Sequence, residues 1–309
     1  MQQDSYPKPA TQSEKCFPLI ISYNNPGVLR RTVYKLLSIG FDIKSLTIYD
    51  NGSSVDVNRQ IRVLTQRAGI RLINSPTNRG WGGAINNFLD DHISHDQREG
   101  ILLIMAHDSY FVSIDLAEVF GFFEDAMAIF VCPAYPHPLT NHYSIFKSYY
   151  SRPGVAKGRI KIGQQTAFFA RASLLKLIRY DEEFWLYGDE YEIFTRASQA
   201  GFHTYVAPRS VVVNPGSDSS TVYAYLSYKL NSLYCAYKRH GYLGLALRSL
   251  VIIYNIIGLF AVGDRFRALC LARCLLFALE NPGHGVRTYR KSQAHQTKYP
   301  IPPLFRQNG

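Results

Sequence analysis

Short apolar runs alternate with segments of helical spacing along the first hundred residues. The apolar runs lie at 17–22, 45–49, 70–73 and 101–105, and polar turn residues follow them. Between them, 27–39, 55–68 and 84–94 have the character of amphipathic helices. Short apolar runs predict buried strands, and apolar side chains every three or four positions predict helices. Strands that alternate with helices are typical of a parallel, doubly wound sheet, so we expect an α/β fold.

The pattern is less regular in the middle of the chain. Apolar runs at 129–131, 165–171 and 204–213 predict three more strands. The segment 189–200 predicts a helix whose first turn is acidic. From Tyr223 onward the spacing is predominantly helical, so a helical extension is expected to follow the sheet.

A nearly continuous apolar stretch at 243–260 lies within this extension. It is long enough to cross a bilayer. However, Arg248 and Asn255 interrupt it, and an arginine at the middle of a membrane helix costs roughly 2.5–3.5 kcal/mol. We therefore favour a helix that packs on the domain or lies in the membrane interface over a membrane span.

These patterns divide the chain into four parts. Residues 1–15 have no apolar segment of the kind found in signal peptides, and we expect a flexible tail. An α/β domain is expected over 16–222, a helical extension with an affinity for membrane surfaces over 223–285, and a basic tail without regular structure over 286–309.

The formal net charge of +11 favours a polyanionic or membrane-surface partner. Nucleic acid, anionic lipid headgroups and lipid pyrophosphates all fit this charge, as does a basic protein without a specific polyanion. The five cysteines are scattered, and none has the spacing of a zinc site. They are typical of reduced thiols in a cytosolic protein.

Polar residues follow the predicted strands where a parallel sheet binds its ligands, beyond the carboxyl ends of the strands. They are Ser22-Tyr23-Asn24, Asp50-Asn51-Gly52-Ser53, the segment from Asn78 to Asn86, and His107-Asp108. Each alone could be a simple turn. Together they predict a nucleotide site, in which carboxylates accept hydrogen bonds from base or ribose and glycine admits a phosphate. Neither G-x-G-x-x-G nor a P-loop is present, which argues against a dinucleotide oxidoreductase and an ATPase.

A second acidic group, Asp189-Glu190-x-Glu192, starts the helix predicted at 189–200. Acidic residues in a first turn are favoured by the helix dipole alone. The functional interpretation is a general base that removes a proton from an acceptor hydroxyl. The aromatic residues just before it, including Trp185 and Tyr187, could hold a sugar ring.

Taken in order, these motifs resemble those of family 2 glycosyltransferases with the GT-A fold, especially the rhamnosyltransferase-like branch. The resemblance covers roughly residues 17–235 and rests on Ile20-Ile21-Ser22-Tyr23-Asn24, Tyr49-Asp50-Asn51-Gly52-Ser53, Asn78-x-Gly80-Trp81-Gly82-Gly83-x-x-Asn86, Tyr180-Asp181-Glu182-Glu183-Phe184-Trp185, and Asp189-Glu190-x-Glu192 followed by Arg196-Ala197-x-x-Ala200-Gly201-Phe202. It implies a mostly parallel sheet flanked by helices, with nucleotide-sugar and acceptor sites in the 16–222 domain.

The resemblance also implies roles for single residues. The donor would be bound by Ser22, Tyr23, Asn24, Asp50, Asn51, Asn78, Gly80, Trp81, Asn86 and His107. Asp108 would hold Mn²⁺ or Mg²⁺, and Trp185 and Tyr187 would contact the acceptor. Glu190 aligns with the family's catalytic aspartate and is the expected base, with Asp189 in reserve and Glu192 in the same cluster.

Two departures from the family pattern concern the metal. The family's D-x-D motif reads Ala106-His107-Asp108 here, and Asn214 stands where a metal-binding histidine is often found. We therefore expect weak metal affinity or a reaction without metal, and an inactive relative is a further alternative.

The sequence thus predicts an inverting transfer of a sugar, rhamnose by resemblance, from a UDP- or dTDP-linked donor to a glycan or lipid-linked saccharide, as in cell-surface polysaccharide synthesis. The expected location is cytoplasmic, peripheral at the inner face of the membrane and its anionic surface, and no nucleic-acid partner is expected. A GT-A-like protein that binds sugar or nucleotide without turnover is the main alternative, and a nucleotidyltransferase is a lesser one.

Overall fold

The computed structural model describes residues 16–98, 100–135, 158–160, 163, 165–215 and 221–295. The predicted tail at 1–15 and residues 296–309 of the predicted basic tail lie outside these ranges. The chain divides into two compact units. Unit 1 is Met1–Asn78, Asn86–Ile178 and Phe194–Pro215, and unit 2 is Arg79–Ile85, Arg179–Ile193 and Gly216–Gly309.

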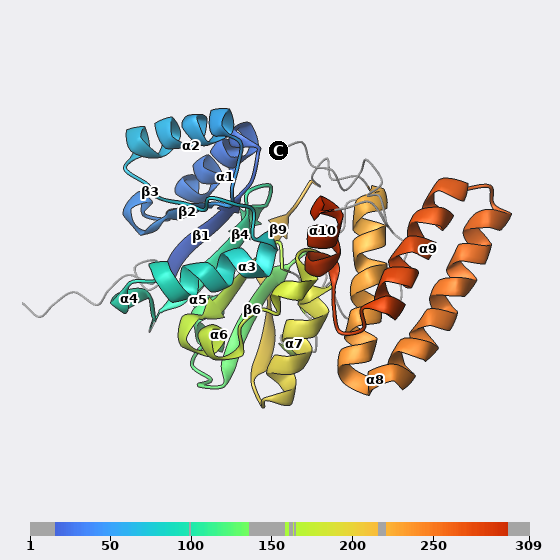
Figure 1. Cartoon of the computed structure of the whole chain (residues 1–309). Helices are drawn as coiled ribbons and strands as arrows, with labels where there is room; N and C mark the ends of the chain where they lie inside the picture. The colour runs from blue at the N-terminus through green and yellow to red at the C-terminus, as the bar shows by residue number, and fades with distance from the viewer. Residues whose placement is uncertain are drawn as a thin grey trace, which may run out of the picture. The chain divides into compact units, whose positions relative to one another are not determined.

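Unit 1 contains one mixed sheet flanked by helices (Figure 1). Its strands are β1 (Cys16–Ser22), β2 (Thr47–Asp50), β3 (Arg71–Asn74), β4 (Ile101–Ala106), β5 (Tyr110–Ser113), β6 (Ala128–Ala134), β7 (Gly158–Arg159), β8 (Ala167–Arg171) and β9 (His203–Val213). Their order is β3-β2-β1-β4-β8-β6-β9-β5, and β7 pairs with β9.

The half of the sheet that carries the predicted nucleotide site is parallel. β1 pairs with β2 and with β4, and β2 pairs with β3, all in parallel. In this register Ser22 lies beside Asp50, and Asp50 beside Asn74. The predicted strand ends therefore meet at one edge of the sheet.

The other half is mixed and less predictable. β8 runs antiparallel to both β4 and β6, β9 is parallel to β6, and β5 and β7 are antiparallel to β9. The expectation of a doubly wound parallel sheet therefore holds for the first four strands only. The sequence pattern also missed β5 and the short helices α5 (Leu116–Phe122) and α6 (Ala172–Ile178).

The two longest helices of unit 1 have clear start or stop signals. α1 (Pro26–Ser38) has Asn25 as its N-cap, whose side chain accepts from the Val28 amide at 3.2 Å, and proline at its first position. α2 (Val55–Ala68) ends at Gly69, which adopts a left-handed conformation. The remaining helices among the described residues of 43–199 are α3 (Gly80–Asn87), α4 (His95–Arg98) and α7 (Asp189–Gln199). Short helical segments are η2 (Ile43–Ser45), η3 (Phe88–His92) and η4 (Glu182–Phe184).

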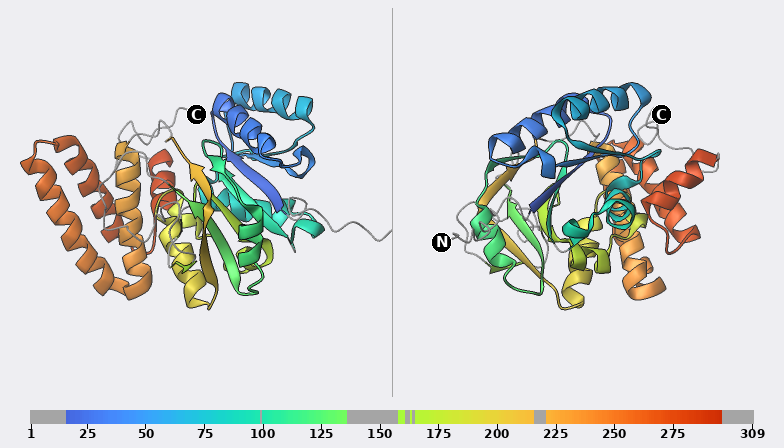
Figure 2. Two further views of the ribbon diagram at one scale, coloured as in Figure 1. Left: turned by 180° about the vertical axis from the view of Figure 1, so that it is seen from behind. Right: turned by 90° about the vertical axis from the view of Figure 1, so that its left-hand side faces the viewer.

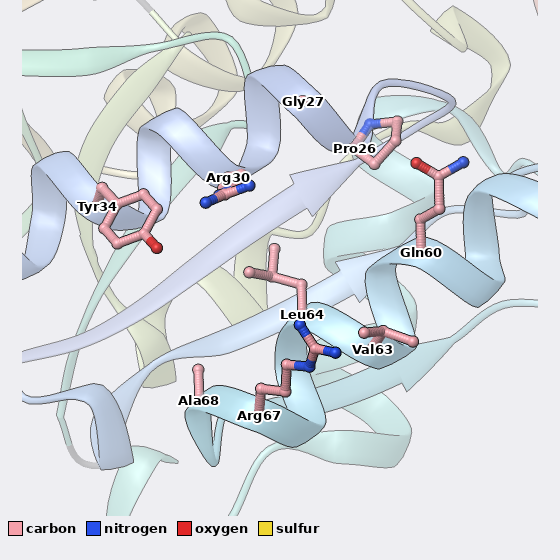
Figure 3. Close-up of a pocket in the computed structure, with 9 residues that line it drawn as sticks. All are labelled: Pro26, Gly27, Arg30, Tyr34, Gln60, Val63, Leu64, Arg67 and Ala68. Atoms are coloured by element: carbon pink, nitrogen blue, oxygen red, sulfur yellow. The ribbon is translucent and has the colours of Figure 1, made fainter.

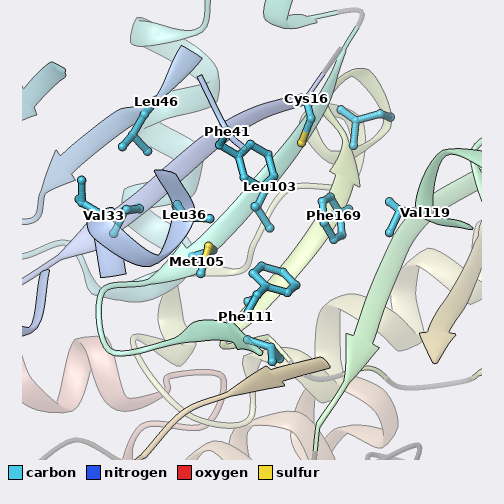
Figure 4. Close-up of a cluster of buried hydrophobic side chains, with 14 of the residues drawn as sticks. Cys16, Val33, Leu36, Phe41, Leu46, Leu103, Met105, Phe111, Val119 and Phe169 are labelled. Atoms are coloured by element: carbon cyan, nitrogen blue, oxygen red, sulfur yellow. The ribbon is translucent and has the colours of Figure 1, made fainter. Parts of the chain in front are cut away.

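The core of unit 1 lies between the sheet and the helices that cover it (Figure 4). Leu36 of α1 and Leu103 and Met105 of β4 are fully buried there, with Phe111 and Phe169 beyond them. Burying an aliphatic or aromatic side chain of this size contributes roughly 1.5–3 kcal/mol each. This core fixes the strand ends from which the predicted site residues project.

Unit 2 has a helical core of its own, built from α8 (Thr221–Ala261), α9 (Arg265–Glu280) and α10 (Val286–His295). α8 bends at Gly241, whose backbone is not helical (φ 59°, ψ −147°). The second part of α8 and α9 then form a hairpin, visible in two views (Figures 1 and 2). At the base of this hairpin, Gly283 lies against the ring of Tyr237.

The second part of α8 leaves a large apolar surface exposed. Among the described residues, one helical stretch, Ala224–Ala261, is long and apolar enough to cross a membrane, and only 22% of its most apolar window is buried. Its exposed side chains include Leu250, Tyr254 and Ile257. The sequence allowed a helix packed on the domain, but this helix contacts protein along one side only.

The expectation that the chain lacks regular structure from Val286 onward is wrong for the described part. Residues 286–295 form α10. Val286 and Tyr289 are fully buried in the core of unit 2, which stabilises a helix that its basic composition does not suggest.

Candidate active site

The loops after β1, β2 and β3 are joined by hydrogen bonds. The Asn24 amide donates to Ser53 Oγ at 2.9 Å, and Asn24 Oδ1 accepts from the Ser54 amide at 2.8 Å. Asn51 Nδ2 donates to Asn78 Oδ1 at 3.2 Å. The structure therefore brings together Asn24, Asn51 and Asn78, which the sequence assigned to one nucleotide site.

Asp50 is the central carboxylate of these loops, and it is fully buried. Its Oδ1 accepts from the Ser53 hydroxyl at 2.5 Å and the Ser53 amide at 3.3 Å. Its Oδ2 accepts from Asn58 Nδ2 at 2.5 Å, and Asn58 also donates to Asn74 Oδ1 at 2.6 Å. These bonds fix the orientation of the carboxylate, and Oδ2, which accepts a single one of them, retains a lone pair.

Gly52 has a different role from the one expected. Its φ is +77°, and a Cβ at this position would lie 2.3 Å from the carbonyl carbon of Thr77 and 2.4 Å from the Asn78 nitrogen. Glycine is therefore needed because two loops of the protein cross here.

The loop after β4 carries His107 and Asp108. Burial lowers the pKa of His107, although the charge of Asp108 opposes this, so the imidazole is neutral at pH 7. Asp108 Oδ1 accepts from Asn214 Nδ2 at 3.0 Å, and Asn214 also donates to Ser109 Oγ at 3.2 Å. β9 thus places Asn214 beside the carboxylate predicted to bind metal.

Two predicted donor-binding residues of unit 1 are buried. Ser22 is fully buried, and its Oγ has no hydrogen-bond partner in the described part of the chain. Asn86, in α3, is buried as well. A buried hydroxyl without a partner costs about 1–3 kcal/mol, which a bound ligand could recover. Tyr23 is half-buried in the same loop.

In unit 2, the glycine-rich segment packs against the segment that precedes the acidic cluster. The Trp81 amide donates to the carbonyl of Trp185 at 2.9 Å, and a Cβ on Gly80 would meet that same oxygen at 2.4 Å. The Trp81 indole nitrogen is buried without a hydrogen-bond partner among the described residues. Gly80 and Trp81 therefore hold the backbone of Trp185 in place.

The three carboxylates at the start of α7 have different surroundings. Asp189 is buried, its Oδ2 has no partner in the described structure, and burial, assisted by the charge of Glu190, raises its pKa well above its ordinary value. Glu192 is buried and bonded to Lys238 Nζ at 2.8 Å. Glu190 is half-buried, and its Oε2 accepts from the Gly188 amide at 2.9 Å. Of the three, Glu190 is the one that is not buried, so it is the most accessible candidate for a base.

Lys238 also bonds to Asp181 at 2.6 Å. Burial would raise the pKa of Asp181, but hydrogen bonds from Lys238 and Tyr234 outweigh it and lower the pKa. Burial would likewise lower the pKa of Lys238, but its two carboxylate partners raise it. These groups therefore remain charged at neutral pH and tie α8 to the segment around the acidic cluster.

The two aromatic residues predicted to contact the acceptor are Trp185 and Tyr187, both in unit 2. The Arg290 guanidinium lies 4.5 Å from the centre of the Trp185 ring, so one face of this ring is covered. Trp185 and Tyr187 are both half-buried and pack against the helical core of unit 2. Both have positive φ, 57° and 65°, which is unusual for bulky residues.

One hollow of unit 1 lies elsewhere, between α1 and α2 (Figure 3). It has a volume of about 440 Å³, and its lining includes Arg30, Tyr34, Gln60 and Arg67. None of the predicted site residues lines it. It is an open surface depression, and we assign the candidate site to the strand ends.

Sequence reasoning missed several residues that fix the site. Asn58 holds Asp50, Lys238 holds Glu192, and Asn231 binds the backbone before α7. Asn58 could have been suspected, since it is a neutral residue in the first turns of a helix that directly follows a strand-end loop. Lys238 and Asn231 carry no such signal.

No group of three or more His, Cys, Asp or Glu side chains in the described residues is arranged to hold a metal ion. Asp108 is the carboxylate available at the strand ends, with neutral His107 next to it in sequence. This donor set does not form a protein cage. It fits an ion that obtains most of its ligands from phosphate oxygens and water, as Mg²⁺ commonly does.

Two solved structures have a similar fold. The mannosyltransferase PcManGT from Pyrobaculum calidifontis, in complex with GDP-Man and Mn²⁺, aligns with a TM-score of 0.56 and 16% identity over 91% of this chain and 84% of its own. GalNAc-T7 with UDP, GalNAc and Mn²⁺ aligns with a TM-score of 0.53 and 14% identity over 71% of this chain. The chain spans about half of GalNAc-T7, 47% of its length. At such low identities the likeness concerns the fold.

The sequence itself matches one family model. No curated protein matches the chain. The model of glycosyl transferase family 2 matches residues 19–181, more than half of the chain, and this range includes the loops after β1 to β4. With the mixed sheet, its flanking helices and the helical region that follows, the fold is GT-A, as the sequence predicted. The chain belongs to glycosyl transferase family 2.

Proposed function

We propose that the protein is an inverting glycosyltransferase in which the strand-end loops of unit 1 bind a nucleoside-diphosphate sugar and Glu190 of unit 2 is the general base. The observation that carries the proposal is the difference among the carboxylates at the start of α7. Asp189 is buried with a raised pKa, and Glu192 is paired with Lys238. Glu190 remains as the carboxylate suited to accept a proton.

In the proposed reaction an acceptor hydroxyl attacks the anomeric carbon of the donor. Glu190 takes the hydroxyl proton as the new carbon–oxygen bond forms, and the bond from the anomeric carbon to the diphosphate oxygen breaks. The electron pair of this bond leaves with the nucleoside diphosphate, and the anomeric configuration inverts. Asp50 and the asparagines around it orient the nucleoside, because they present fixed acceptors and donors at the strand ends.

A divalent ion, Mn²⁺ or Mg²⁺, would be held by Asp108 together with the donor's phosphates. When bound, such an ion stabilises the negative charge of the leaving diphosphate. Both similar structures described above contain Mn²⁺, and the fold family thereby supports the proposal. Asn214 orients Asp108 toward this role through its amide.

The donor's sugar and base are proposed more broadly. A UDP- or dTDP-linked sugar, with rhamnose as the candidate by resemblance, agrees with the family motifs. Since the similar structures contain UDP in one case and GDP-Man in the other, a donor screen should include guanosine donors. The proposed acceptor is a hydroxyl of a glycan or lipid-linked saccharide.

The test measures release of nucleoside diphosphate with UDP-, dTDP- and GDP-sugars, with and without Mn²⁺. The variant is Glu190→Gln, and the control is Glu124→Gln, which changes an exposed glutamate of unit 1 in the same way. We expect loss of a general base to lower turnover on the order of 10²–10⁴-fold, whereas the control keeps the rate. Full activity of Glu190→Gln would refute its role, and nucleotide binding without turnover for any donor would favour the non-catalytic alternative.

We also propose that the second part of α8 docks into a lipid bilayer. With 100° per residue, the exposed positions from Leu243 to Val262 cover an arc of about 200°. No acidic residue occurs from Gly241 to Gly263. Asp264 comes next and pairs with Arg267 at 3.2 Å, and Arg265 lies between them. The apolar stripe by which one helix pairs with another is narrower than this arc. The hydrocarbon of a bilayer therefore covers the exposed face of α8 better than a second copy of this protein would. The arginines suit anionic headgroups.

The docking test is sedimentation with vesicles of phosphatidylglycerol and phosphatidylcholine. Leu250→Gln with Ile257→Gln replaces two exposed side chains of α8, and Val55→Gln with Leu177→Gln makes the same change at exposed positions of unit 1. Because each apolar side chain contributes roughly 1.5–3 kcal/mol when buried, the first pair should weaken binding about 100-fold or more. Equal loss in both pairs would contradict the proposal. A location at the inner face of the cytoplasmic membrane agrees with five buried cysteines, none of which forms a disulfide.

A further inference from the structure

The backbone just before the acidic cluster is strained. Trp185 has φ 57° and ψ −61°, Tyr187 has φ 65°, and Gly188 has φ 86°. Bulky residues rarely adopt positive φ, and they retain it only where surrounding contacts enforce it. The segment 184–188 therefore needs an external support, and the described structure of unit 2 shows where that support comes from.

Asn231, in the first part of α8, provides it. This residue is almost completely buried, with 1% of its surface exposed. Its Nδ2 donates to three backbone carbonyls of the strained segment, those of Phe184 at 2.8 Å, Leu186 at 3.2 Å and Tyr187 at 2.6 Å. One amide group thus bonds to three carbonyls of an irregular backbone, and because it has two hydrogens, two of the carbonyls share one of them.

The other end of the same side chain reaches a different helix. Asn231 Oδ1 accepts from the Val286 amide at 3.2 Å, at the first residue of α10. A primary amide has two donor hydrogens and an acceptor oxygen, so it can bond to carbonyls on one side and to an amide on the other. Aspartate lacks the donor, and leucine lacks both groups.

The strained segment leads directly into the proposed base. The amide of Gly188 is the donor to Glu190 Oε2 at 2.9 Å. Displacement of the carbonyls of Leu186 and Tyr187 would turn the following peptide groups, and with them this amide. The position of the Glu190 carboxylate therefore depends on the bonds that Asn231 makes.

A second set of bonds supports the same segment from α10. Glu183 accepts from the Gly285 amide at 3.1 Å, the Thr288 amide at 3.3 Å and the Thr288 hydroxyl at 2.8 Å. The start of α10 and the first part of α8 therefore both bind the residues that precede α7. The helices after the sheet do more than offer a surface for lipid.

We propose that Asn231 is a positioning residue for Glu190, acting through the backbone of residues 184–188. This inference rests on the proposed role of Glu190 as the base. Its loss should lower turnover without altering donor affinity, because the proposed nucleoside contacts belong to the strand-end loops of unit 1. A misplacement of about 1 Å can cost on the order of 100-fold in rate.

The test compares Asn231→Asp and Asn231→Ala with Asn281→Ala. Asn281 is a matched control because its Nδ2 also donates to a backbone carbonyl of unit 2, that of Phe277 at 3.1 Å, but at the end of α9. We expect kcat of both Asn231 variants to fall about 10- to 100-fold, with an unchanged KM for the donor and a changed pH profile of kcat. The control should retain the wild-type values. An Asn231→Asp enzyme with wild-type kcat and pH profile would overturn the proposal.

A second readout does not depend on activity. The chain has two tryptophans, Trp81 and Trp185, and their backbones bond to each other at the strained segment. Acrylamide quenching of tryptophan fluorescence should increase in the Asn231 variants and remain unchanged in Asn281→Ala. If the wild-type protein turns over no donor, the proposed function fails. Increased quenching in the Asn231 variants would still show that Asn231 holds residues 184–188 in place. If the Asn231 variants do not fold, Thr288→Val, which removes one bond to Glu183, should give a smaller increase in quenching. No increase would refute the proposal.

Discussion

Gly52 offers a direct test of how the strand-end loops are built. It adopts φ +77°, and a Cβ there would lie 2.3 Å from backbone carbon of Thr77. Backbone atoms cannot rotate away as a flexible side chain can. Gly52→Ala should therefore push apart the loops that follow β2 and β3 and break the 3.2 Å bond from Asn51 to Asn78.

The expected cost has two parts. A left-handed conformation costs an alanine about 1–2 kcal/mol, and the reduced freedom of the unfolded chain returns about 0.4–1 kcal/mol. Overpacking adds about 1–3 kcal/mol. We therefore expect Gly52→Ala to lower the free energy of unfolding by about 1–5 kcal/mol, compared with the roughly 5–15 kcal/mol of a typical domain.

Gly69 is the matched control. Its φ is +69°, and a Cβ there would meet nothing within 4 Å. Gly69→Ala therefore carries the conformational cost without the overpacking. The difference between the free energies of unfolding of the two variants, measured by urea denaturation, gives the cost of the contact with Thr77. Titration with the nucleoside diphosphate released in the donor screen should show weaker binding for Gly52→Ala alone. Equal destabilisation in the two variants would refute the claim that the loop crossing requires glycine.

Three further predictions concern Asp189, Asn58 and the cysteines. Burial raises the pKa of Asp189 above 3.8, so the folded state keeps this proton as the pH rises while the unfolded state loses it. The stability of the wild type relative to Asp189→Asn should therefore be greatest below pH 3.8 and should fall as the pH rises through the raised pKa. Urea midpoints of the two proteins that run parallel from pH 4 to 8 would contradict this. Asn58→Ala removes a donor to Asp50 and should weaken nucleotide binding on the order of 10-fold, as a bond to a charged group contributes about 1.5–3 kcal/mol; unchanged affinity in calorimetry would argue against it. Burial raises the pKa of Cys16, and that of Cys274 to about 12, so iodoacetamide at pH 8 should modify few of the five thiols before denaturation and all five afterwards, as counted by mass spectrometry.

The first four strands could be predicted because their signal is local. Runs such as Leu19-Ile20-Ile21 are buried on both faces, so the sequence alone marks them as strands. β5 has no such mark, since only Phe111 of its four residues is buried and its partner is Val211–Val213, about a hundred residues later. Similarly, α10 was not predicted because most of its residues are polar, and of its described side chains only Val286 and Tyr289 are buried in the core of unit 2.

The candidate site, too, could be predicted only in part. The strand-end positions of Asp50 and Asp108 follow from the sheet topology, and the sequence contains them. Their orientation depends on partners such as Asn214, 106 residues from Asp108. No pattern along the chain ties Asn231 to the segment at 184–188, because an asparagine on the buried side of an apolar helix has the spacing of a core position. Only the folded backbone reveals the carbonyls that it binds.

The closed base of the helical hairpin has a topological consequence. Since Gly283 returns to the ring of Tyr237, the chain leaves and re-enters the body of unit 2 at the same level. A bilayer that received the second part of α8 would have both flanks of the stretch on one side. Donor entry, transfer and product release would then all take place in one compartment. A lipid-linked product needed on the opposite side of the membrane would require a separate translocation step after this enzyme.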